Sequence, residues 1–371
     1  MRYYLIAGEA SGDLHGANLI KGIRAEDPDA EIRFWGGDMM SEASGGTPPV
    51  VHYRDGAVMG YAEVLLKAGK LSRRLARCKS DLLAWRPDVV ILIDYPGFNL
   101  KIAKHCHKYG VKVFYYIAPK TWASRSGRNK HLKAWVDKLF VIFPFETAYF
   151  DAQGIDYEYH GNPLLDAVDA HDYVCPSETP YIALLAGSRR SEVSHMMPVC
   201  MEAARKLGTK VIVAGAPSLS MEDYAPYIPD GLDVEVIFGR TYDILRYARA
   251  AIINSGTASL EAALIGTPQL VCWSTGRLTY IVAEYVLKVR KRIKYISLGN
   301  LCLGRQAFRE LVQDDFTPDA VCSELGRLTS DEEYRQKMLD DYAQIRKSLG
   351  GRGASAAIAR AMIKELKSKA I

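Results

Sequence analysis

Several features that would assign a chain of 371 residues at once are missing from this sequence. No apolar run reaches the ~18 residues that a helix needs to cross a bilayer. The chain opens on a short apolar run instead of a basic leader followed by a cleavage site, so we expect a cytosolic protein, free or bound to a surface. The P-loop signature, the GxGxxG fingerprint and the GxSxG elbow are also absent. Kinase, dinucleotide-dependent and serine hydrolase interpretations therefore lose their main support.

The chain also lacks the residue patterns that hold metals or disulfides. Its seven cysteines form no CxxC pair, are odd in number and lie singly in apolar or helical segments, which is typical of reduced packing residues. None of its eight histidines forms an HxxxH or HExxH pattern. We therefore expect no metal site.

The composition is that of an ordinary globular protein. Apolar residues make up 49% of the chain and charged residues 25%. A chain of this length divides naturally into two domains of roughly 150 to 200 residues. The net charge of +5 is too small to indicate nucleic acid by itself, so the location of the positive charge matters more than its sum.

The first seventeen residues contain a strong local signal. The run from Tyr3 to Ala7 predicts a buried strand, and it passes directly into a polar turn and a helix. Such a unit opens a doubly wound sheet, which binds ligands at the carboxyl ends of its strands. Ser11, Gly12 and Asp13 would then lie at a ligand-binding edge, unless Ser11 or Asp13 is a plain helix cap. Carboxylates at Glu9 and Asp13 would repel an anion, so we do not expect phosphate there.

Strand-like and helix-like segments alternate in both halves of the chain. The continuous apolar run from Val89 to Ile93 is typical of a strand buried on both faces of a parallel sheet, and it ends at Asp94. The alternation stops over residues 166–180, which contain two prolines and lack periodicity. We therefore predict an α/β fold of two Rossmann-like, doubly wound domains that face a cleft, joined by this linker.

The expected domain limits follow from this alternation. The first domain would span residues 1–165 and the second residues 180–345. The remaining strands are predicted at 31–35, 50–53, 111–117, 139–143, 181–186, 210–214, 234–238, 250–253 and 269–272.

A long amphipathic segment runs from Met59 to Trp85. Its leucines form an apolar face, and lysines and arginines surround that face. A solvated helix packed on the sheet is the favoured interpretation. A helix that touches an anionic lipid surface is the alternative.

Two turns in the second half have the composition of a diphosphate site. In the first, Gly187, Ser188 and Arg189 follow a predicted strand and precede a helix, so backbone N–H groups, a hydroxyl and a guanidinium group converge. The helix dipole contributes only ~0.3–1 kcal/mol, so the arginine would supply most of the affinity for an anion.

The second turn follows the predicted strand 250–253. Ser255, Gly256 and Thr257 open a helix, and Glu261 lies one turn further on, where a carboxylate would suit the paired hydroxyls of a ribose. A capping box built on Thr257 is the alternative. Together, the two turns predict a nucleotide site in the second domain.

Five positive charges occur within residues 288–294, next to aromatic and aliphatic side chains. They belong to Lys288, Arg290, Lys291, Arg292 and Lys294. Because each basic residue near an anionic leaflet contributes ~1 kcal/mol, we predict a membrane-facing segment. A nucleic-acid patch is the rival, but no recognition module accompanies it, and a plain solvated helix is the third interpretation.

Nine motifs resemble those of one known family. In chain order they are AGEASGDLHGA, VMGYAEV, IDYPGFN, YYIAPKTWA, FPFE, GNPLLD, LAGSRRSEV, INSGTASLEAALIGTP and SLGNLCLGR. They resemble the lipid-A-disaccharide synthases, glycosyltransferases of the GT-B fold, from residue 1 to about residue 312. The chain departs from that family at Gly97 in IDYPGFN, where an acidic residue is common, so Asp94 is the carboxylate that matches.

The resemblance implies an inverting transfer of 2,3-diacylglucosamine from its UDP conjugate to the 6-hydroxyl of 2,3-diacylglucosamine 1-phosphate. Asp94 would be the general base, with a structural turn or helix cap as its alternative. The residues that would bind UDP are Gly187, Ser188, Arg189, Ser255, Gly256, Thr257, Glu261 and Asn300. Asn300 is included because it matches a family motif, and a turn-stabilising role beside Gly299 is nearly as well supported. Ser11, Gly12 and Asp13 would lie on the acceptor side.

The resemblance also bears on cofactors and partners. GT-B enzymes use protein groups in place of a divalent metal, so we expect no cofactor, the UDP-sugar being a substrate. Because both substrates carry acyl chains, we expect the protein at the anionic surface of the cytoplasmic face of the inner membrane, and not on nucleic acid. GT-B proteins often return their last helix to the N-terminal domain, so the resemblance implies that the final helix, about 354–371, packs back onto the first domain. A homodimer is left open.

Two other functions are also left open by the sequence. One is a different UDP-sugar enzyme of the same architecture, such as a 2-epimerase or a transferase acting on another lipid-linked sugar. The other is a non-catalytic nucleotide-sugar binder, which would not need Asp94.

Overall fold

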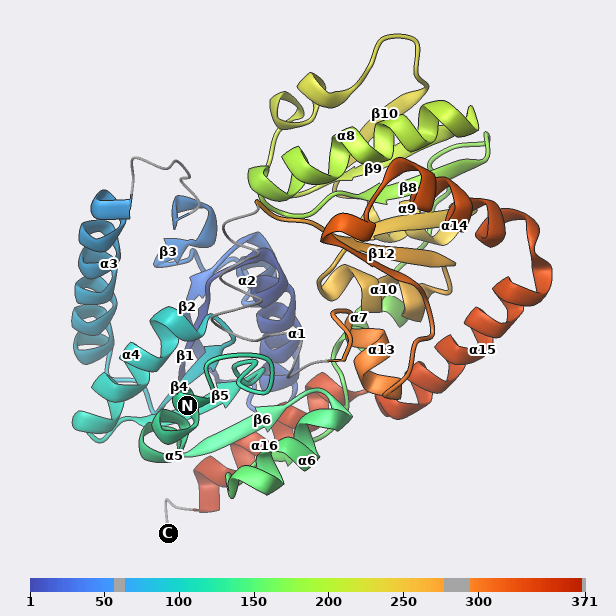
Figure 1. Cartoon of the computed structure of the whole chain (residues 1–371). Helices are drawn as coiled ribbons and strands as arrows, with labels where there is room; N and C mark the ends of the chain where they lie inside the picture. The colour runs from blue at the N-terminus through green and yellow to red at the C-terminus, as the bar shows by residue number, and fades with distance from the viewer. Residues whose placement is uncertain (57–63, 277–293, 369–371) are drawn as a thin grey trace. The chain divides into compact units, whose positions relative to one another are not determined.

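The structure is a computed structural model that describes residues 1–56, 64–276 and 294–368. The chain forms two compact units (Figure 1). The N-terminal unit consists of Met1–Asp166 and Gly350–Ile371, and the C-terminal unit of Ala167–Leu349. Each unit contains one parallel sheet with helices packed on it.

The sheet of the N-terminal unit has the strand order β3-β2-β1-β4-β5-β6-β7. Its strands are β1 (Arg2–Ala7), β2 (Glu31–Gly36), β3 (Val51–His52), β4 (Val89–Ile93), β5 (Lys112–Tyr116), β6 (Lys138–Val141) and β7 (Glu158–Tyr159). The helices with residues in this unit are α1 (Ala10–Glu26), α2 (Asp38–Ala43), α3 (Val64–Trp85), α4 (Pro96–Lys108), α5 (Asn129–Trp135), α6 (Pro144–Gln153), α7 (Leu164–Asp169, which crosses the unit boundary) and α16 (Ala354–Ser368).

The sheet of the C-terminal unit has the order β10-β9-β8-β11-β12-β13. Its strands are β8 (Tyr181–Leu185), β9 (Lys210–Gly215), β10 (Val234–Phe238), β11 (Ala250–Asn254), β12 (Gln269–Trp273) and β13 (Glu310–Val312). The described helices are α8 (Arg190–Leu207), α9 (Thr241–Tyr247), α10 (Thr257–Ile265), α13 (Leu298–Leu303), α14 (Pro318–Ser330) and α15 (Glu332–Ser348).

The central strands form where the sequence is apolar without interruption. Each residue of Val89–Ile93 is fully buried, because helices cover both faces of β4. β4 pairs with β1 in parallel register, Tyr3 opposite Val89 and Ala7 opposite Ile93. In each sheet the order of the strands along the chain reverses at one place, between β1 and β4 and between β8 and β11. These two places are the topological switch points, at which doubly wound sheets bind ligands.

Helix α3 packs on the sheet in the part whose side chains are described. Leu75, Cys78 and Leu82 are buried in the core, while Arg73 and Arg77 on the opposite side are exposed. The favoured interpretation of this segment, an amphipathic helix packed on the sheet, is therefore confirmed for these residues.

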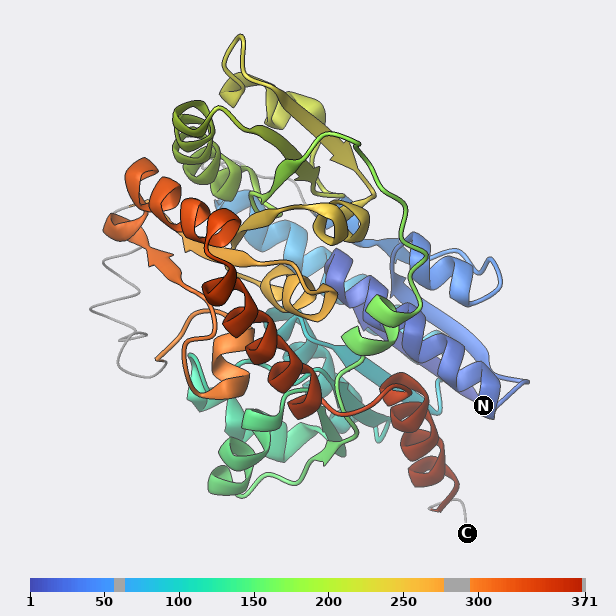
Figure 2. The same ribbon diagram turned by 90° about the vertical axis from the view of Figure 1, so that its right-hand side faces the viewer.

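The C-terminal helix α16 belongs to the N-terminal unit and packs along α1 (Figures 1 and 2). A Cβ atom on Gly22 of α1 would lie 3.0 Å from the Cβ of Ala359 and 3.1 Å from the carbonyl oxygen of Ser355. Arg360 of α16 forms an ion pair of 2.9 Å with Glu26 at the end of α1. A glycine on one helix and small residues on the other allow the two backbones to approach closely.

The boundary between the two units, between Asp166 and Ala167, falls at the start of the segment expected to be a linker, residues 166–180. Helix α7 extends to Asp169, and residues from 167 onward belong to the C-terminal unit.

No helix in the described ranges combines the length and the apolar character that crossing a membrane requires.

Candidate active site

The turns that follow β1 and β4 pack against each other at the carboxyl edge of the N-terminal sheet. A Cβ atom on Gly8 would lie 2.5 Å from the ring of Tyr95, so a glycine is needed to leave room for that ring. β1 and β4 flank the switch point of this sheet. Asp94, between β4 and Tyr95, therefore lies at the edge where a ligand is expected.

The backbone at Asp94 and Tyr95 is in the left-handed region. Their φ angles are 43° and 46°, which costs roughly 1 kcal/mol or more for each non-glycine residue. The carbonyl oxygen of Asp94 accepts hydrogen bonds from Asn99 Nδ2 at 2.8 Å and from the Tyr115 hydroxyl at 2.6 Å, and these hold the turn. Tyr95 is the residue that precedes α4, and no side chain caps this helix. The alternative in which Asp94 is a helix cap is therefore wrong.

The electrostatic surroundings of Asp94 come from three neighbouring turns. Burial is the largest influence on the pKa of its carboxyl group and raises it. The ammonium group of Lys120, after β5, lowers this pKa, and the carboxylate of Glu9, after β1, raises it. The net result is a raised pKa, which makes the ionised carboxylate a stronger base than an exposed aspartate.

Asp13 holds the start of α2. Its buried carboxylate accepts hydrogen bonds from the backbone N–H groups of Gly37, Met39 and Met40, at 2.6, 3.1 and 3.2 Å. These bonds satisfy donors that the first turn of a helix leaves without partners. The sequence suggested that Asp13 shapes the acceptor side, whereas its carboxylate is engaged by the protein's own backbone.

The rest of the first turn is arranged differently from a plain helix cap. α1 begins after Glu9 with no side-chain hydrogen bond at its cap, so neither Ser11 nor Asp13 caps it. Ser11 is exposed, while Gly12 is buried, its built Cβ 3.2 Å from that of Ala7. Ser11 is thus the residue of the predicted acceptor-side set whose side chain is accessible.

Glu146 is a second carboxyl group that Lys120 influences. Its Oε2 accepts hydrogen bonds from the N–H groups of Ile142 and Phe143, at 3.2 and 3.1 Å, and its Oε1 from Trp122 Nε1 at 3.2 Å. Burial raises the pKa of Glu146 to about 7, although these hydrogen bonds and Lys120 lower it. Glu146 therefore ties the loop after β5 to the start of α6.

The first turn of the C-terminal unit is organised around a carboxylate that the sequence analysis did not single out. Gly187 has a φ of 106°, and a Cβ there would lie 2.5 Å from Glu192 Oε2 and 2.6 Å from Asn254 Nδ2. Glu192 accepts hydrogen bonds from the N–H of Ser188 at 2.8 Å and from Arg189 Nη1 at 2.7 Å. An N–H group and a guanidinium group therefore already converge on an anionic group here, beside the switch point between β8 and β11.

The second turn continues from the neighbouring strand β11. The N–H of Ser255 donates to the Cys272 carbonyl at 2.9 Å, and its Oγ donates to the Ile296 carbonyl at 3.0 Å. α10 begins at Thr257 after Gly256, with no side-chain hydrogen bond at the cap. The capping-box interpretation of Thr257 is therefore wrong.

Glu261 of α10 is held from helix α9. Its Oε1 accepts a hydrogen bond of 3.0 Å from the hydroxyl of Tyr242. Burial raises the pKa of Glu261, and this hydrogen bond lowers it. The ring of Tyr242 in turn meets the ring of His171 edge-on, with 5.3 Å between centroids.

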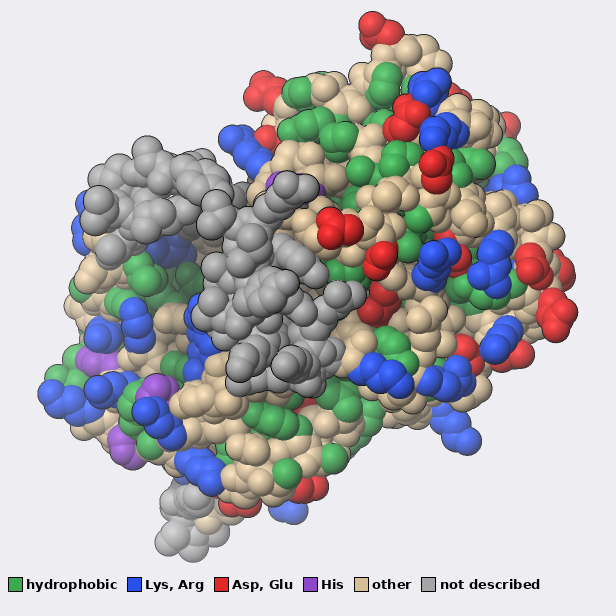
Figure 3. Space-filling view, in the orientation of Figure 1, with side chains coloured by type: hydrophobic (Ala, Val, Ile, Leu, Met, Phe, Trp, Pro, Cys, Tyr) green, Lys and Arg blue, Asp and Glu red, His purple; other side chains and the backbone are tan. Residues whose placement is uncertain are grey.

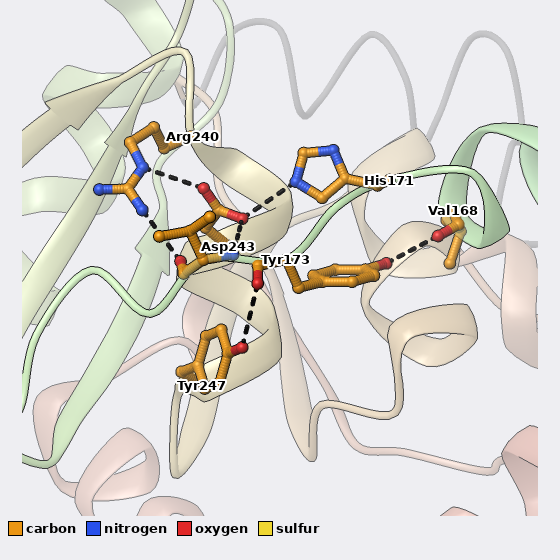
Figure 4. A network of polar contacts seen from close by, with 7 residues as sticks. Val168, His171, Tyr173, Arg240, Asp243 and Tyr247 are labelled. Carbon is orange, nitrogen blue, oxygen red and sulfur yellow. Dashed lines mark hydrogen bonds and ion pairs between the residues drawn. The ribbon is translucent and has the colours of Figure 1, made fainter.

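His171 belongs to a network that fixes residues 171–174 to α9 (Figure 4). Asp243 Oδ1 lies 3.0 Å from His171 Nε2 and accepts the N–H of Val174 at 3.0 Å. Arg240 donates to Asp243 Oδ2 at 2.9 Å and to the Val174 carbonyl at 2.9 Å. These bonds explain why the segment expected as a linker is part of the C-terminal unit.

Asn300 is buried and uses its whole amide group within the protein. Its Nδ2 donates to the Phe308 carbonyl at 3.0 Å and to Glu310 Oε1 at 2.8 Å, and its Oδ1 accepts the N–H of Ala307 at 2.7 Å. Glu310 also accepts the N–H groups of Ile296 and Ser297, at 2.9 and 3.0 Å. These bonds support the alternative in which Asn300 has a structural role. Glu310 also links Asn300 to Ile296, whose carbonyl oxygen accepts the hydrogen bond from Ser255.

Two further predictions concern the basic segment and Gly97. Residues 288–292 of the predicted membrane-facing set lie outside the described residues, as does most of the VMGYAEV motif. Lys294, the last of that set, is exposed, and its Nζ lies 5.3 Å from the ring centre of Tyr295. Gly97 is exposed, and a Cβ there would meet no atom within 4 Å.

The comparisons with known proteins agree on one family. Residues 3–362 match the family model of lipid-A-disaccharide synthetase. The lipid-A-disaccharide synthase of Trichlorobacter lovleyi is 38% identical over 367 residues, which cover 95% of this chain and 94% of that protein. That of Geobacter sulfurreducens is 36% identical over 379 residues, which cover 98% and 97%. The chain belongs to the lipid-A-disaccharide synthase family.

Solved structures support the fold of this family member. The UDP-GlcNAc 2-epimerase of Methanocaldococcus jannaschii, in complex with UDP-GlcNAc and UDP, aligns with a TM-score of 0.66 at 13% identity, covering 98% of this chain and 100% of that one. The calicheamicin glycosyltransferase CalG4 aligns with a TM-score of 0.57 at 16% identity, covering 99% and 98%. The predicted GT-B fold, an α/β fold with two Rossmann-like domains, is confirmed, and as a lipid-A-disaccharide synthase the chain is a glycosyltransferase of lipid A biosynthesis.

Three residues that support the candidate site were not predicted. Glu192 lies three residues after Arg189, and that spacing on a helix was a usable signal. Tyr242 and Glu310 reach Glu261 and Asn300 from other elements, 19 and 10 residues away. No local pattern connects such pairs.

Proposed function

We propose that this enzyme transfers 2,3-diacylglucosamine from its UDP conjugate to the 6-hydroxyl of 2,3-diacylglucosamine 1-phosphate with inversion. The products are the β-1,6-linked disaccharide 1-phosphate and UDP. Membership of the lipid-A-disaccharide synthase family supports these substrates, and the two switch-point sites support a division of labour between the units.

The observation that carries the mechanism is the position and environment of Asp94. It lies on a strained turn at the switch point of the N-terminal sheet, with a pKa raised chiefly by burial. In the proposed step the Asp94 carboxylate takes the proton of the acceptor 6-hydroxyl as that oxygen bonds to C1 of the donor sugar. The bond between C1 and the diphosphate oxygen breaks at the same time, and its electron pair leaves with UDP. Such a base contributes typically ~10²–10⁴ to the rate.

The donor is proposed to bind in the C-terminal unit. When the donor binds, the Ser188 N–H and the Arg189 guanidinium would release Glu192 and bind the diphosphate instead. The backbone at Gly256 and Thr257 would add N–H donors. The free oxygen of Glu261 would bind the ribose. Positive charge on a guanidinium group and N–H dipoles would stabilise the leaving diphosphate, so the proposal includes no metal or other cofactor.

Asp94→Asn tests the assignment. We expect this variant to lose at least ~10²-fold in turnover, because the amide cannot accept the proton, and to bind UDP as tightly as the wild type. Turnover is measured by mass detection of the disaccharide, and UDP binding by calorimetry. Unchanged turnover would exclude Asp94 as the base.

The same assay separates the competing functions. Purified enzyme is given UDP-2,3-diacylglucosamine and the 1-phosphate acceptor, and in parallel unacylated UDP-GlcNAc. Disaccharide from the acylated pair supports the proposal. Epimerised UDP-GlcNAc without disaccharide would indicate a 2-epimerase, and UDP binding without any product a nucleotide-sugar binder.

We also propose that the enzyme works as a peripheral protein on the cytoplasmic face of the inner membrane, because both proposed substrates are anchored there by acyl chains. Reversible attachment to an anionic leaflet requires only a cluster of basic side chains. Flotation with vesicles measures this attachment, and light scattering during size-exclusion chromatography shows whether the enzyme is a homodimer.

A further inference from the structure

A stretch of the N-terminal unit has no acidic residue. Residues 95–136 contain nine lysines and arginines, three histidines and no aspartate or glutamate. The two units differ accordingly, with 27 basic against 20 acidic residues in the N-terminal unit and 21 against 23 in the C-terminal unit. The excess positive charge of the chain therefore belongs to the N-terminal unit.

The structure gathers part of this charge on helices α4 and α5. Five exposed lysines occupy these helices, and we call them the α4–α5 surface: Lys101, Lys104, Lys108, Lys130 and Lys133. Spacings of three and four residues place their side chains on one side of each helix. The Nζ of Lys104 lies 5.5 Å from the ring centre of Trp135, so the two helices meet at this surface. In Figure 3, blue and purple side chains accordingly cover the area of α4 and α5 at the lower left.

The positive charges at this surface lower the pKa values of two histidines. Burial lowers the pKa of His131, and the neighbouring Lys130, Lys104 and Arg128 lower it further. Burial also lowers the pKa of His105, and the charges of Lys79 and Lys108 lower it further, while a hydrogen bond with the Lys79 backbone raises it. The charges of these basic side chains therefore disfavour a further positive charge on the two imidazoles, as expected where like charges gather on one surface.

Aromatic rings adjoin the lysines. The side chain of Tyr109, at the end of α4, is 51% exposed, and its ring lies 5.6 Å from Lys108 Nζ. His131 stacks on Trp135 with 4.4 Å between ring centres. Exposed tyrosines next to lysines are typical of protein surfaces that lie at a membrane–water interface.

None of the five lysines has an ion pair to a carboxylate within the described ranges. We propose that the α4–α5 surface docks the enzyme on an anionic phospholipid bilayer. The proposal rests on the proposed function, because lipid-anchored substrates require such a contact. It is distinct from segment 288–294 and assigns membrane binding to residues of the N-terminal unit.

The experiment measures sedimentation of the full-length enzyme with vesicles of phosphatidylcholine and phosphatidylglycerol. Each lysine near an anionic leaflet strengthens partitioning roughly fivefold, so Lys101→Gln/Lys130→Gln should bind about 25-fold more weakly. The control Lys337→Gln/Lys347→Gln removes the same charge from two exposed lysines of α15 and should bind like the wild type. Circular dichroism and thermal unfolding verify that each variant is folded.

Three outcomes would overturn the proposal. The first is equal vesicle binding by the α4–α5 variant and the wild type, and the second is an equal loss of vesicle binding in the α4–α5 variant and the α15 control. The third is that the wild type binds a single-stranded oligonucleotide more tightly than it binds the vesicles at the same salt concentration. Turnover of short-chain, water-soluble substrates is measured without vesicles. If the wild type fails there while vesicle binding follows the lysines, the proposed function fails and the docking surface does not.

Discussion

Strained backbone at single residues gathers where the strands of this enzyme end. Of the six non-glycine residues with positive φ in the described ranges, Asp94, Tyr95, Ile117 and Gln313 directly follow β4, β5 or β13. Each such residue costs about 1 kcal/mol or more and persists only where surrounding bonds enforce it. At Asp94 those bonds come from Asn99 and Tyr115, which hold its backbone carbonyl and so keep the turn at the switch point in place.

The acid side of the pH–rate profile tests the environment of Asp94. The base must be ionised, so kcat/KM should fall on the acid side at a pH above the ordinary pKa of an aspartate, because the pKa of Asp94 is raised. Glu9→Gln removes a carboxylate that raises this pKa and should move the fall to lower pH. Lys120→Gln removes a cation that lowers it and should move the fall to higher pH.

The two shifts must have opposite signs. Lys364→Gln, which removes one exposed charge of α16 in the same unit, serves as the control and should leave the profile unchanged. Shifts of equal direction in the Glu9 and Lys120 variants would mean that another group controls the profile.

Tyr242 provides a second test, on the donor side. Tyr242→Phe removes the hydrogen bond that orients Glu261 and lowers its pKa, so UDP should bind about tenfold more weakly near neutral pH. The acid-side loss of UDP affinity should also move to higher pH. Calorimetric titration of UDP at a series of pH values measures both effects. His171, whose ring contacts that of Tyr242, is not mutated in this variant.

Tyr247→Phe is the matched control for this change. Tyr247 lies on the same helix, and its hydroxyl donates to the Tyr173 carbonyl at 3.3 Å instead of to Glu261. Tyr247→Phe should leave the pH dependence of UDP affinity the same as in the wild type. If both variants changed affinity alike, Tyr242 would have only a structural role.

At the scale of elements, apolar runs were the reliable guide. Strand β4 spans the predicted residues Val89–Ile93, because a short run of β-branched and aliphatic residues between turn signals is typical of a strand buried on both faces. Short elements such as α2 and β13 were not predicted, because six or three residues carry too little periodicity. The contacts of the segment 166–180 with the C-terminal unit were not predicted, because they depend on bonds to Asp243, which lies far along the chain.

The candidate site was predictable only in part, for the same reason. Residue types in the turns after strands located Asp94, Ser188 and Arg189, since parallel strands bring their carboxyl ends to one edge. The partners of Asp13 and Asn300 are set by tertiary packing. A polar residue in a turn can face a ligand or a backbone N–H, and its sequence neighbours do not distinguish the two.

The packing of α16 on α1 can be tested at its closest point. Gly22→Leu would force side-chain atoms into the backbone of α16 near Ser355 and Ala356, so we expect a loss of about 1–3 kcal/mol in the free energy of unfolding. Gly326→Ala, in α14 with no atom within 4 Å of its built Cβ, should instead stabilise by ~0.5–1 kcal/mol. Denaturant unfolding measures both. A stable Gly22→Leu variant would contradict close packing of the two helices.

For the whole molecule, the distribution of charge matters more than its sum. The net charge of +5 suggests no particular partner, yet it consists of an excess of basic residues in the N-terminal unit and a slight acidic excess in the C-terminal unit. An anionic surface would therefore attract one unit and weakly repel the other. Attraction of this kind orients a protein before contact and depends on ionic strength.

Ionic strength should therefore affect turnover only when the substrates lie in a membrane. The Debye length falls from about 10 Å at 0.1 M salt to about 3 Å at 1 M, so salt should lower kcat/KM several-fold for substrates presented in anionic vesicles. Water-soluble short-chain analogues should be turned over equally well at both salt concentrations, because their binding does not use the α4–α5 surface. Lys101→Gln/Lys130→Gln should reduce the salt dependence with vesicles, whereas Lys337→Gln/Lys347→Gln should retain it. An equal salt effect on both kinds of substrate would place the effect at the catalytic site instead of the membrane contact.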